Sequence, residues 1–190
     1  DRVYELNRSF RNEGLSTRHN PEFTMLEAYQ AYGDRGTMMD LVEALICEAA
    51  KALLGSLQFA FQGQPIDLAP PWERVSFTRA MADMGLAPQA PLEEIQRVLA
   101  ARGMRVQGLS RSQLVRLVEQ LFEPKTKAKP LFVVDYWTEL SPLAKSTPED
   151  PRITDRFELF IGGLEVANAY SELNDPVEQR RRFEAQLNSE

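Results

Sequence analysis

The sequence has few of the residues on which several common kinds of chemistry depend. Its single cysteine, Cys47, cannot form an internal disulfide or a cysteine-based zinc site. Its single histidine, His19, lies in no Ser/His or Cys/His arrangement that would suggest nucleophilic catalysis. No apolar run is long enough to span a bilayer, and the first residues do not resemble a signal peptide. We therefore expect a protein without a membrane segment, with the cytoplasm as its default location.

Length and charge limit the function further. The chain has 190 residues, 43% of them hydrophobic and 26% charged, which is ordinary for one globular domain or a large part of one. A net charge of −6 argues against strong nucleic-acid binding by this chain alone, because phosphate contacts need clustered Lys and Arg. The chain opens on a strand-like run without a leading Met, and we expect that both of its ends are cut from a longer protein.

Residues 1–33 have the pattern of two extended runs joined by a polar loop. In the second run Phe23, Met25, Glu27 and Tyr29 alternate with residues of the other face, which is the period of a strand. The loop is dense in groups that bind anions, namely Arg11, Glu13, Arg18, His19 and Asn20. This pattern predicts an antiparallel pair of strands with a charged tip, a suitable place to hold a nucleotide.

Residues 154–176 have the pattern of a hairpin. Side chains alternate from Arg156 to Ile161, and Gly162-Gly163 suits a two-residue turn. In that register Glu158 and Glu165 share one face, within roughly 7–8 Å at the backbone. Two carboxylates at that distance can share a divalent ion.

A regular second strand would leave Asn168, Tyr170 and Glu172 on the apolar face of this hairpin. A β-bulge near residues 167–169 would reverse the alternation and bring them to the polar face. We therefore predict such a bulge.

The rest of the chain is mostly helical in pattern. A capping box at Thr37 and Asp40 predicts a helix that ends at Gly55, with Cys47 as a structural thiol on it. Short strands are predicted in 57–61, 65–68 and 131–134. Three helices are predicted in 76–84, 92–102 and 110–122, and we interpret residues 70–123 as a helical insertion. A last helix is predicted from Val177 to Leu187, with Arg180–Arg182 on a solvated face.

Two long stretches resemble a known family. RNEGLSTRHNPEFTMLE at 11–27 resembles motif 2 of the class II aminoacyl-tRNA synthetases, in the form of the lysine-specific members. SPLAK at 141–145 and TDRFELFIGGLEVANAYSELNDP at 154–176 resemble the same family. The resemblance is to part of the catalytic domain of bacterial-type lysyl-tRNA synthetases. It implies an α+β fold, with an antiparallel β-sheet of the class II type flanked by helices and carrying a helical insertion. Motif 1, motif 3 and an anticodon-binding domain are not recognisable in the chain.

The family resemblance implies an activity and its substrates. Lysine is activated by ATP to lysyl-adenylate and then transferred to tRNA(Lys), with Mg²⁺ as cofactor and a homodimer as the assembled state. Arg11 would be the catalytic residue. The expected ATP-binding residues are Arg11, Glu13, Arg18, His19, Asn20 and Phe23. The expected lysine-binding residues are Glu27, Tyr29, Asn168, Tyr170 and Glu172, and the expected metal ligands are Glu158 and Glu165.

Several alternatives stay open at the level of sequence. Phe23 could pack in a core rather than stack on adenine, and a lone histidine is more often structural than functional. The chain could belong to a paralogue that delivers lysine to a protein or a lipid, or to a synthetase-like binding module without catalysis. Trp137 stands where the family commonly has a proline, so the neighbouring Tyr136 and Glu139 are assigned no role.

Overall fold

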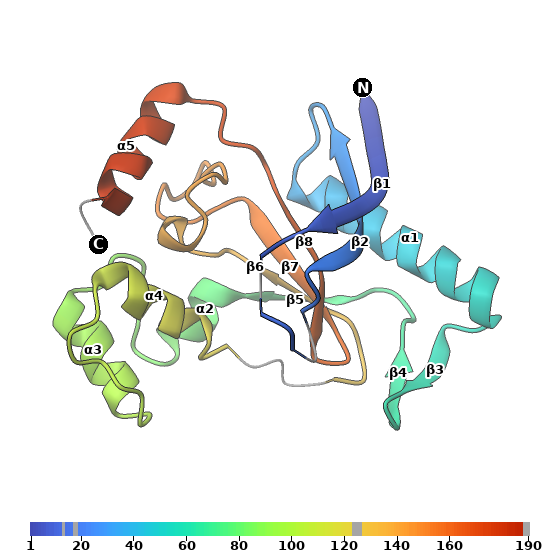
Figure 1. Ribbon diagram of the computed structural model, residues 1–190, viewed down its shortest axis with the longest axis horizontal. Helices are drawn as coiled ribbons and strands as arrows, with labels where there is room; N and C mark the ends of the chain where they lie inside the picture. Colours follow the sequence, from blue (N-terminus) through green and yellow to red (C-terminus); the bar gives the residue numbers. More distant parts are fainter. Residues whose placement is uncertain (13, 17–18, 123–126, 188–190) are drawn as a thin grey trace. The chain divides into compact units, whose positions relative to one another are not determined.

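The computed structural model describes residues 1–12, 14–16, 19–122 and 127–187 (Figure 1). The chain divides into two compact units, Asp1–Gly33 and Asp34–Glu190. Within the described residues no helix combines the length and the apolar character that crossing a bilayer requires. The two units are taken in turn.

The first unit is the predicted strand–loop–strand. Strand β1 (Arg2–Phe10) pairs antiparallel with β2 (Glu22–Gln30). The register sets Ser9 opposite Phe23 and Glu5 opposite Glu27. Because side chains alternate along a strand, Phe23, Glu27 and Tyr29 share one face, as the sequence predicts.

The second unit begins with helix α1 (Arg35–Leu54), whose start differs from the prediction. Asp34, not Thr37, is the N-cap, and its Oδ1 accepts a hydrogen bond from the Thr37 backbone N–H at 2.8 Å. The prediction was wrong by three residues because Asp34 satisfies the free amides of the first turn. The predicted stop is confirmed, since Gly55 is left-handed with φ of 66°. Cys47 is buried and its Sγ donates to the Leu68 carbonyl at 3.4 Å, which confirms a structural thiol.

A four-stranded sheet in the order β5-β6-β7-β8 forms the centre of this unit. Strand β5 (Glu73–Ser76) runs parallel to β6 (Leu131–Val134), whereas β7 (Arg156–Ile161) and β8 (Leu164–Tyr170) add antiparallel pairings. The two short strands predicted in 57–61 and 65–68 are also confirmed, as β3 (Gln58–Phe61) and β4 (Gln64–Asp67), and they pair antiparallel. Strand β5 was not predicted, because four residues with two charges carry no clear alternating pattern. It lies inside 70–123, so the helical part of that range begins only after β5.

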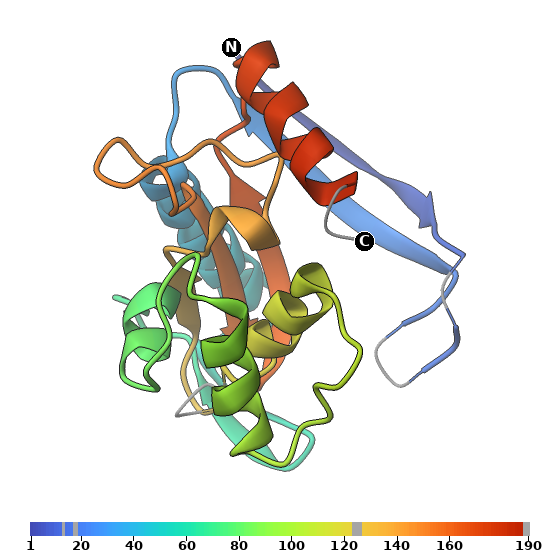
Figure 2. The same cartoon turned by 90° about the vertical axis from the view of Figure 1, so that its left-hand side faces the viewer.

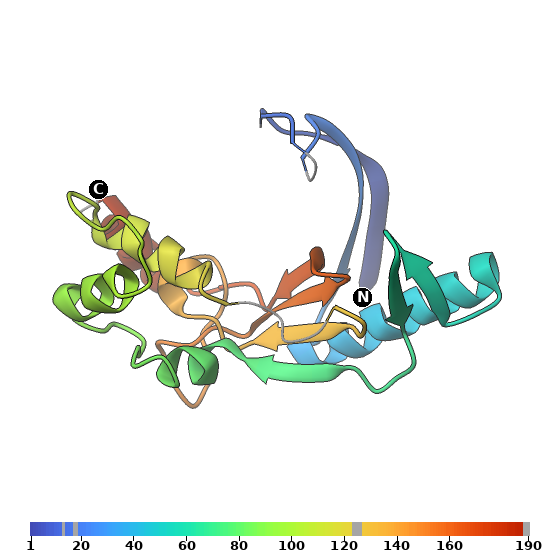
Figure 3. The same cartoon turned by 90° about the horizontal axis from the view of Figure 1, so that it is seen from below.

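The helices pack on the sheet in two separate cores. Leu131 and Val133 of β6 join a cluster with α2 (Phe77–Ala82), α3 (Leu92–Ala100) and α4 (Arg111–Glu119). Phe132 and Val134 point the other way, into a cluster with α1. Figures 2 and 3 show α2–α4 grouped together and α1 apart from them. A sheet flanked by helices confirms the predicted α+β class.

The last helix, α5 (Pro176–Leu187), begins one residue before the predicted Val177 and ends at the predicted Leu187. Arg180 and Arg181 are exposed as predicted, but Arg182 is not. Arg182 is only 7% exposed. Its guanidinium donates to carbonyl groups of the segment 141–146, which follows the short 3₁₀ helix η1 (Thr138–Leu140). The prediction is wrong for Arg182 because the sequence of three consecutive arginines does not reveal which of them meets acceptors from another part of the chain.

Candidate active site

A β-bulge at Val166 assembles the polar face of the hairpin. Phe160 pairs with Glu165 and Leu159 with Ala167, which leaves Val166 without a partner. The bulge therefore exists, one residue before the predicted range. Beyond it Asn168 lies opposite Glu158. The alternation is reversed as predicted, so Glu158, Glu165 and Asn168 lie on one face of the sheet.

Arg156 lies at the centre of this face. Its guanidinium donates to the Glu158 carboxylate, to Asn168 Oδ1 at 3.3 Å, and to the Ser141 hydroxyl. It also stacks over the Tyr136 ring, 4.6 Å from the ring centroid. Arg156 is 9% exposed, so its charge is balanced by these partners rather than by water. Sequence reasoning assigned it no role, although the strand alternation already placed a cation on the face that carries Glu158.

Tyr136 completes the partners of Glu158. Its hydroxyl donates to Glu158 Oε2 at 2.6 Å, while Arg156 takes Oε1. Burial and the adjacent Glu158 charge raise the pKa of Tyr136 well above its usual range, so the hydroxyl stays protonated as a donor. Two donors on one carboxylate fix the orientation of Glu158. The sequence offered no signal for this, since Tyr136 and Glu158 are far apart in the chain.

Two further carboxylates lie in the field of Glu158. Partial desolvation and the Glu158 charge raise the pKa of Glu165. The same two causes raise the pKa of Glu119, at the end of α4. The Glu158 charge therefore disfavours the charged form of both carboxyls, and a nearby cation would favour it.

The donor chemistry here fits Mg²⁺. Carboxylates such as Glu158 and Glu165 offer hard oxygen donors, and each Glu158 oxygen keeps a lone pair after accepting its one hydrogen bond. Among the described residues no group of three or more His, Cys, Asp or Glu has a metal-binding arrangement. Mg²⁺ is usually held by one or two carboxylates, with water and phosphate oxygens filling its other positions. Two carboxylates are therefore enough to hold one Mg²⁺ ion, with water and phosphate oxygens as its other ligands.

Two of the expected lysine-binding residues, Tyr170 and Glu172, lie just beyond this cluster along the chain. Tyr170 is 38% exposed, and partial burial with the nearby Glu172 charge raises its pKa. Glu172 follows β8 and forms an isolated β-bridge with Ala144. An exposed tyrosine beside an exposed carboxylate can take an aliphatic chain that ends in an ammonium group.

The remaining predicted residues lie in the first unit. The Arg11 guanidinium lies over the Phe23 ring, 5.3 Å from its centroid, beside a hollow of about 410 Å³ lined by Asn20–Thr24. His19 Nδ1 lies 3.0 Å from Ser16 Oγ, and the Tyr29 hydroxyl is 3.5 Å from Glu27 Oε1. Glu13 and Arg18 lie outside the described residues. The strand pair thus brings a cation and an aromatic ring to the edge of the hollow.

Comparisons with known proteins agree with these observations. Residues 1–190 match the family model of tRNA synthetases class II (D, K and N). The chain is 47% identical over 192 residues to a lysine–tRNA ligase of Carboxydothermus hydrogenoformans, covering 98% of this chain and 39% of that protein. It is 48% identical to the lysine–tRNA ligase of Pelotomaculum thermopropionicum, with 98% and 38% covered. The chain thus spans about two fifths of the length of these relatives. With the whole chain matched by the family model, it belongs to the class II tRNA synthetases of the D, K and N group.

Proposed function

We propose that the protein is a lysine–tRNA ligase, which activates lysine with ATP to lysyl-adenylate and transfers the lysyl group to tRNA(Lys). The observation that carries this proposal is the polar face of β7 and β8, where the Val166 bulge gathers Glu158, Glu165 and Asn168. The names of the similar proteins support the choice of lysine. We also propose a cytoplasmic homodimer.

In the activation step the lysine carboxylate attacks the α-phosphorus of ATP and pyrophosphate leaves. Negative charge builds on the α-phosphoryl oxygens, so fixed cations are the main requirement. Arg11 would clamp two of these oxygens with its planar fork. Phe23 would stack on adenine, and His19 and Asn20 would contact the terminal phosphates.

Glu158 and Glu165 would hold Mg²⁺, with Arg156 and Tyr136 keeping Glu158 in one orientation. When bound, Mg²⁺ would neutralise charge on the phosphates. Arg156 has a second effect, because its Nε–H donates to Asn168 Oδ1 and leaves the amide nitrogen of Asn168 as the donor to the Glu165 carboxylate. Asn168 would contact the end of lysine that carries the α-amino and carboxylate groups.

Recognition of the lysine side chain would depend on Glu172. The ε-ammonium loses water when it binds and needs a negative partner. Tyr170 would pack on the methylene groups, while Tyr29 and Glu27 would bind polar atoms of the amino acid. The Glu172 charge beside Tyr170 supports this arrangement.

Amino-acid-dependent ATP–pyrophosphate exchange tests the proposal. It should be run with each amino acid on the complete product of the gene that encodes this chain, and in parallel on the 190-residue chain. Exchange with lysine alone is expected in the complete product. Lack of exchange with every amino acid would favour a binding module without catalysis.

A second assay identifies the acceptor. Labelled lysine is supplied with ATP and either a tRNA(Lys) transcript, a protein acceptor such as elongation factor P, or lipid vesicles. Label on tRNA(Lys) alone is expected. Label on the protein or lipid instead would make the chain part of a lysyl-transferring paralogue.

A further inference from the structure

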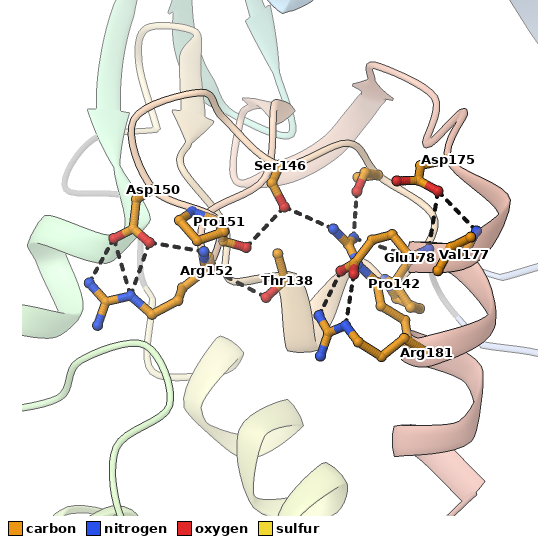
Figure 4. A network of polar contacts seen from close by, with 12 residues as sticks. Thr138, Pro142, Ser146, Asp150, Pro151, Arg152, Asp175, Val177, Glu178 and Arg181 are labelled. Carbon is orange, nitrogen blue, oxygen red and sulfur yellow. Dashed lines mark hydrogen bonds and ion pairs between the residues drawn. The ribbon is translucent and has the colours of Figure 1, made fainter.

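Arg182 of α5 is a buried arginine whose three guanidinium nitrogens each have a partner outside the polar face described above. Its Nη1 donates to the Ala144 carbonyl at 2.7 Å and to the Pro142 carbonyl at 3.3 Å. Its Nη2 donates to Ser146 Oγ at 2.8 Å. One guanidinium thus binds three positions of the segment 141–146, and Figure 4 shows Pro142, Ser146 and α5 within this network.

Glu178 holds the Arg182 guanidinium in place. It lies one turn earlier on α5, and its Oε1 accepts from Arg182 Nε at 2.8 Å. Its two oxygens also accept from Arg181, each at 2.7 Å. These donors lower the pKa of Glu178 to about 2, so it remains charged in neutral solution. Asp175 in turn caps the start of α5 through the Val177 backbone N–H at 2.9 Å.

The opposite side of segment 141–146 is paired with the backbone around Glu172. The Lys145 N–H donates to the Ser171 carbonyl at 2.7 Å, and the Leu173 N–H donates to the Leu143 carbonyl at 2.9 Å. Ala144, whose carbonyl Arg182 holds, forms a β-bridge with Glu172. Segment 141–146 therefore links a buried cation on one side to Glu172 on the other.

We propose that Arg182 is a positioning residue for lysine recognition. By holding segment 141–146 it fixes the backbone of Glu172, and so places that carboxylate for the ε-ammonium of lysine. The inference rests on the proposed function, because it assumes that Glu172 binds lysine. An arginine is needed because its fork reaches three acceptors and Glu178 together, which a single ammonium group cannot do.

Kinetics of pyrophosphate exchange in the complete gene product test this role. Arg182→Gln is expected to raise KM for lysine at least tenfold and to change KM for ATP less than twofold. Arg182→Lys keeps the positive charge but loses the planar guanidinium group, and an intermediate rise in KM for lysine is expected. Arg180→Gln, an exposed neighbour on the same helix, is the matched control and should leave both KM values unchanged. An equal rise in both KM values would overturn the proposal, because a general loss of structure affects both substrates.

A double-mutant cycle with Glu172→Gln tests whether Arg182 acts through Glu172. If it does, Arg182→Gln adds less than a twofold rise in lysine KM once Glu172→Gln is present. Full additivity would overturn the proposal. If Arg182→Gln does not fold, as seen by circular dichroism, Arg182→Lys takes its place in the cycle.

Hydrogen exchange separates this inference from the proposed function. The Lys145 and Leu173 amides should exchange at least tenfold faster in the Arg182 variants than in Arg180→Gln. Unchanged protection would overturn the role of Arg182 whatever the kinetics show. If the unaltered protein has no lysine-dependent pyrophosphate exchange, the proposed function fails. The lysine role of Arg182 then fails with it, and the amide data alone decide whether Arg182 holds the segment.

Discussion

Replacing Tyr136 with Phe tests how Glu158 is held. The change removes one hydroxyl and leaves the buried ring, so no cavity forms. The lost hydrogen bond is the 2.6 Å contact to Glu158 Oε2. A hydrogen bond to a charged group contributes about 1.5–3 kcal/mol to stability. Because Arg156 still pairs with the other oxygen, we expect a value near the middle of this range, about 2 kcal/mol.

Unfolding in urea, followed by circular dichroism, measures this loss in the 190-residue chain. The midpoint should fall while the slope stays constant, because the surface exposed on unfolding is unchanged. The same loss corresponds to a drop in Tm of about 4–8 °C for a protein of this size. Tyr32→Phe is the control, since Tyr32 is fully exposed and should change stability by less than about 0.5 kcal/mol. If both variants lose equally little, Tyr136 does not hold Glu158 in solution.

Four further predictions follow from the site. Arg11→Lys should lower the rate of pyrophosphate exchange about 100-fold, because one ammonium group cannot replace the paired hydrogen bonds of a guanidinium to the phosphate oxygens. An unchanged rate would show that Arg11 has no role in catalysis. Glu172→Gln should raise KM for lysine on the order of 100-fold with little change for ATP, and equal losses would count against its assignment. Glu165→Gln should abolish Mg²⁺-dependent exchange and yet raise Tm at neutral pH. Because the pKa of Glu165 is raised in the folded protein, its charged form opposes folding at pH values above that pKa. The gain in Tm from Glu165→Gln should therefore vanish in acid. A Tm that falls at neutral pH would contradict this prediction. The pKa of Glu178 is lowered from 4.5 to about 2 in the folded protein. Its contribution to folding stability is therefore complete above pH 4.5 and is lost as the pH falls toward 2. Tm of the unaltered chain should therefore fall more steeply over that range than Tm of Glu178→Gln, with a loss of about 1 kcal/mol after allowance for solvent screening.

The position of the bulge explains how a polar cluster and an apolar core share one short strand. Before Val166 the outward residue of β8 is Glu165, and after it the outward residues are Asn168 and Tyr170. Without the extra residue the last two would point into the core of α1. A polar side chain there would have no hydrogen-bond partner, and that cost favours the bulge.

The sequence by itself determined the local elements and most of the hairpin. A two-residue alternation and the Gly162-Gly163 pair predict β7, β8 and their turn, because these signals depend only on near neighbours in the chain. The same reasoning predicts the bulge, since regular alternation would bury polar groups. The helix stop at Gly55 is equally local.

Only the tertiary structure decided which charged groups are buried and what they hold. Strand alternation places Arg156 on the face of Glu158, but nothing near Arg156 or Arg182 in the sequence shows that either is buried. Each finds its acceptors on segments that the fold brings beside it, including Ser141 for Arg156 and Ala144 for Arg182. Tyr136 reaches Glu158 in the same way, across β6 and β7. A hydrogen bond between distant segments depends on the packing of the whole unit, and local sequence patterns carry no information about that packing.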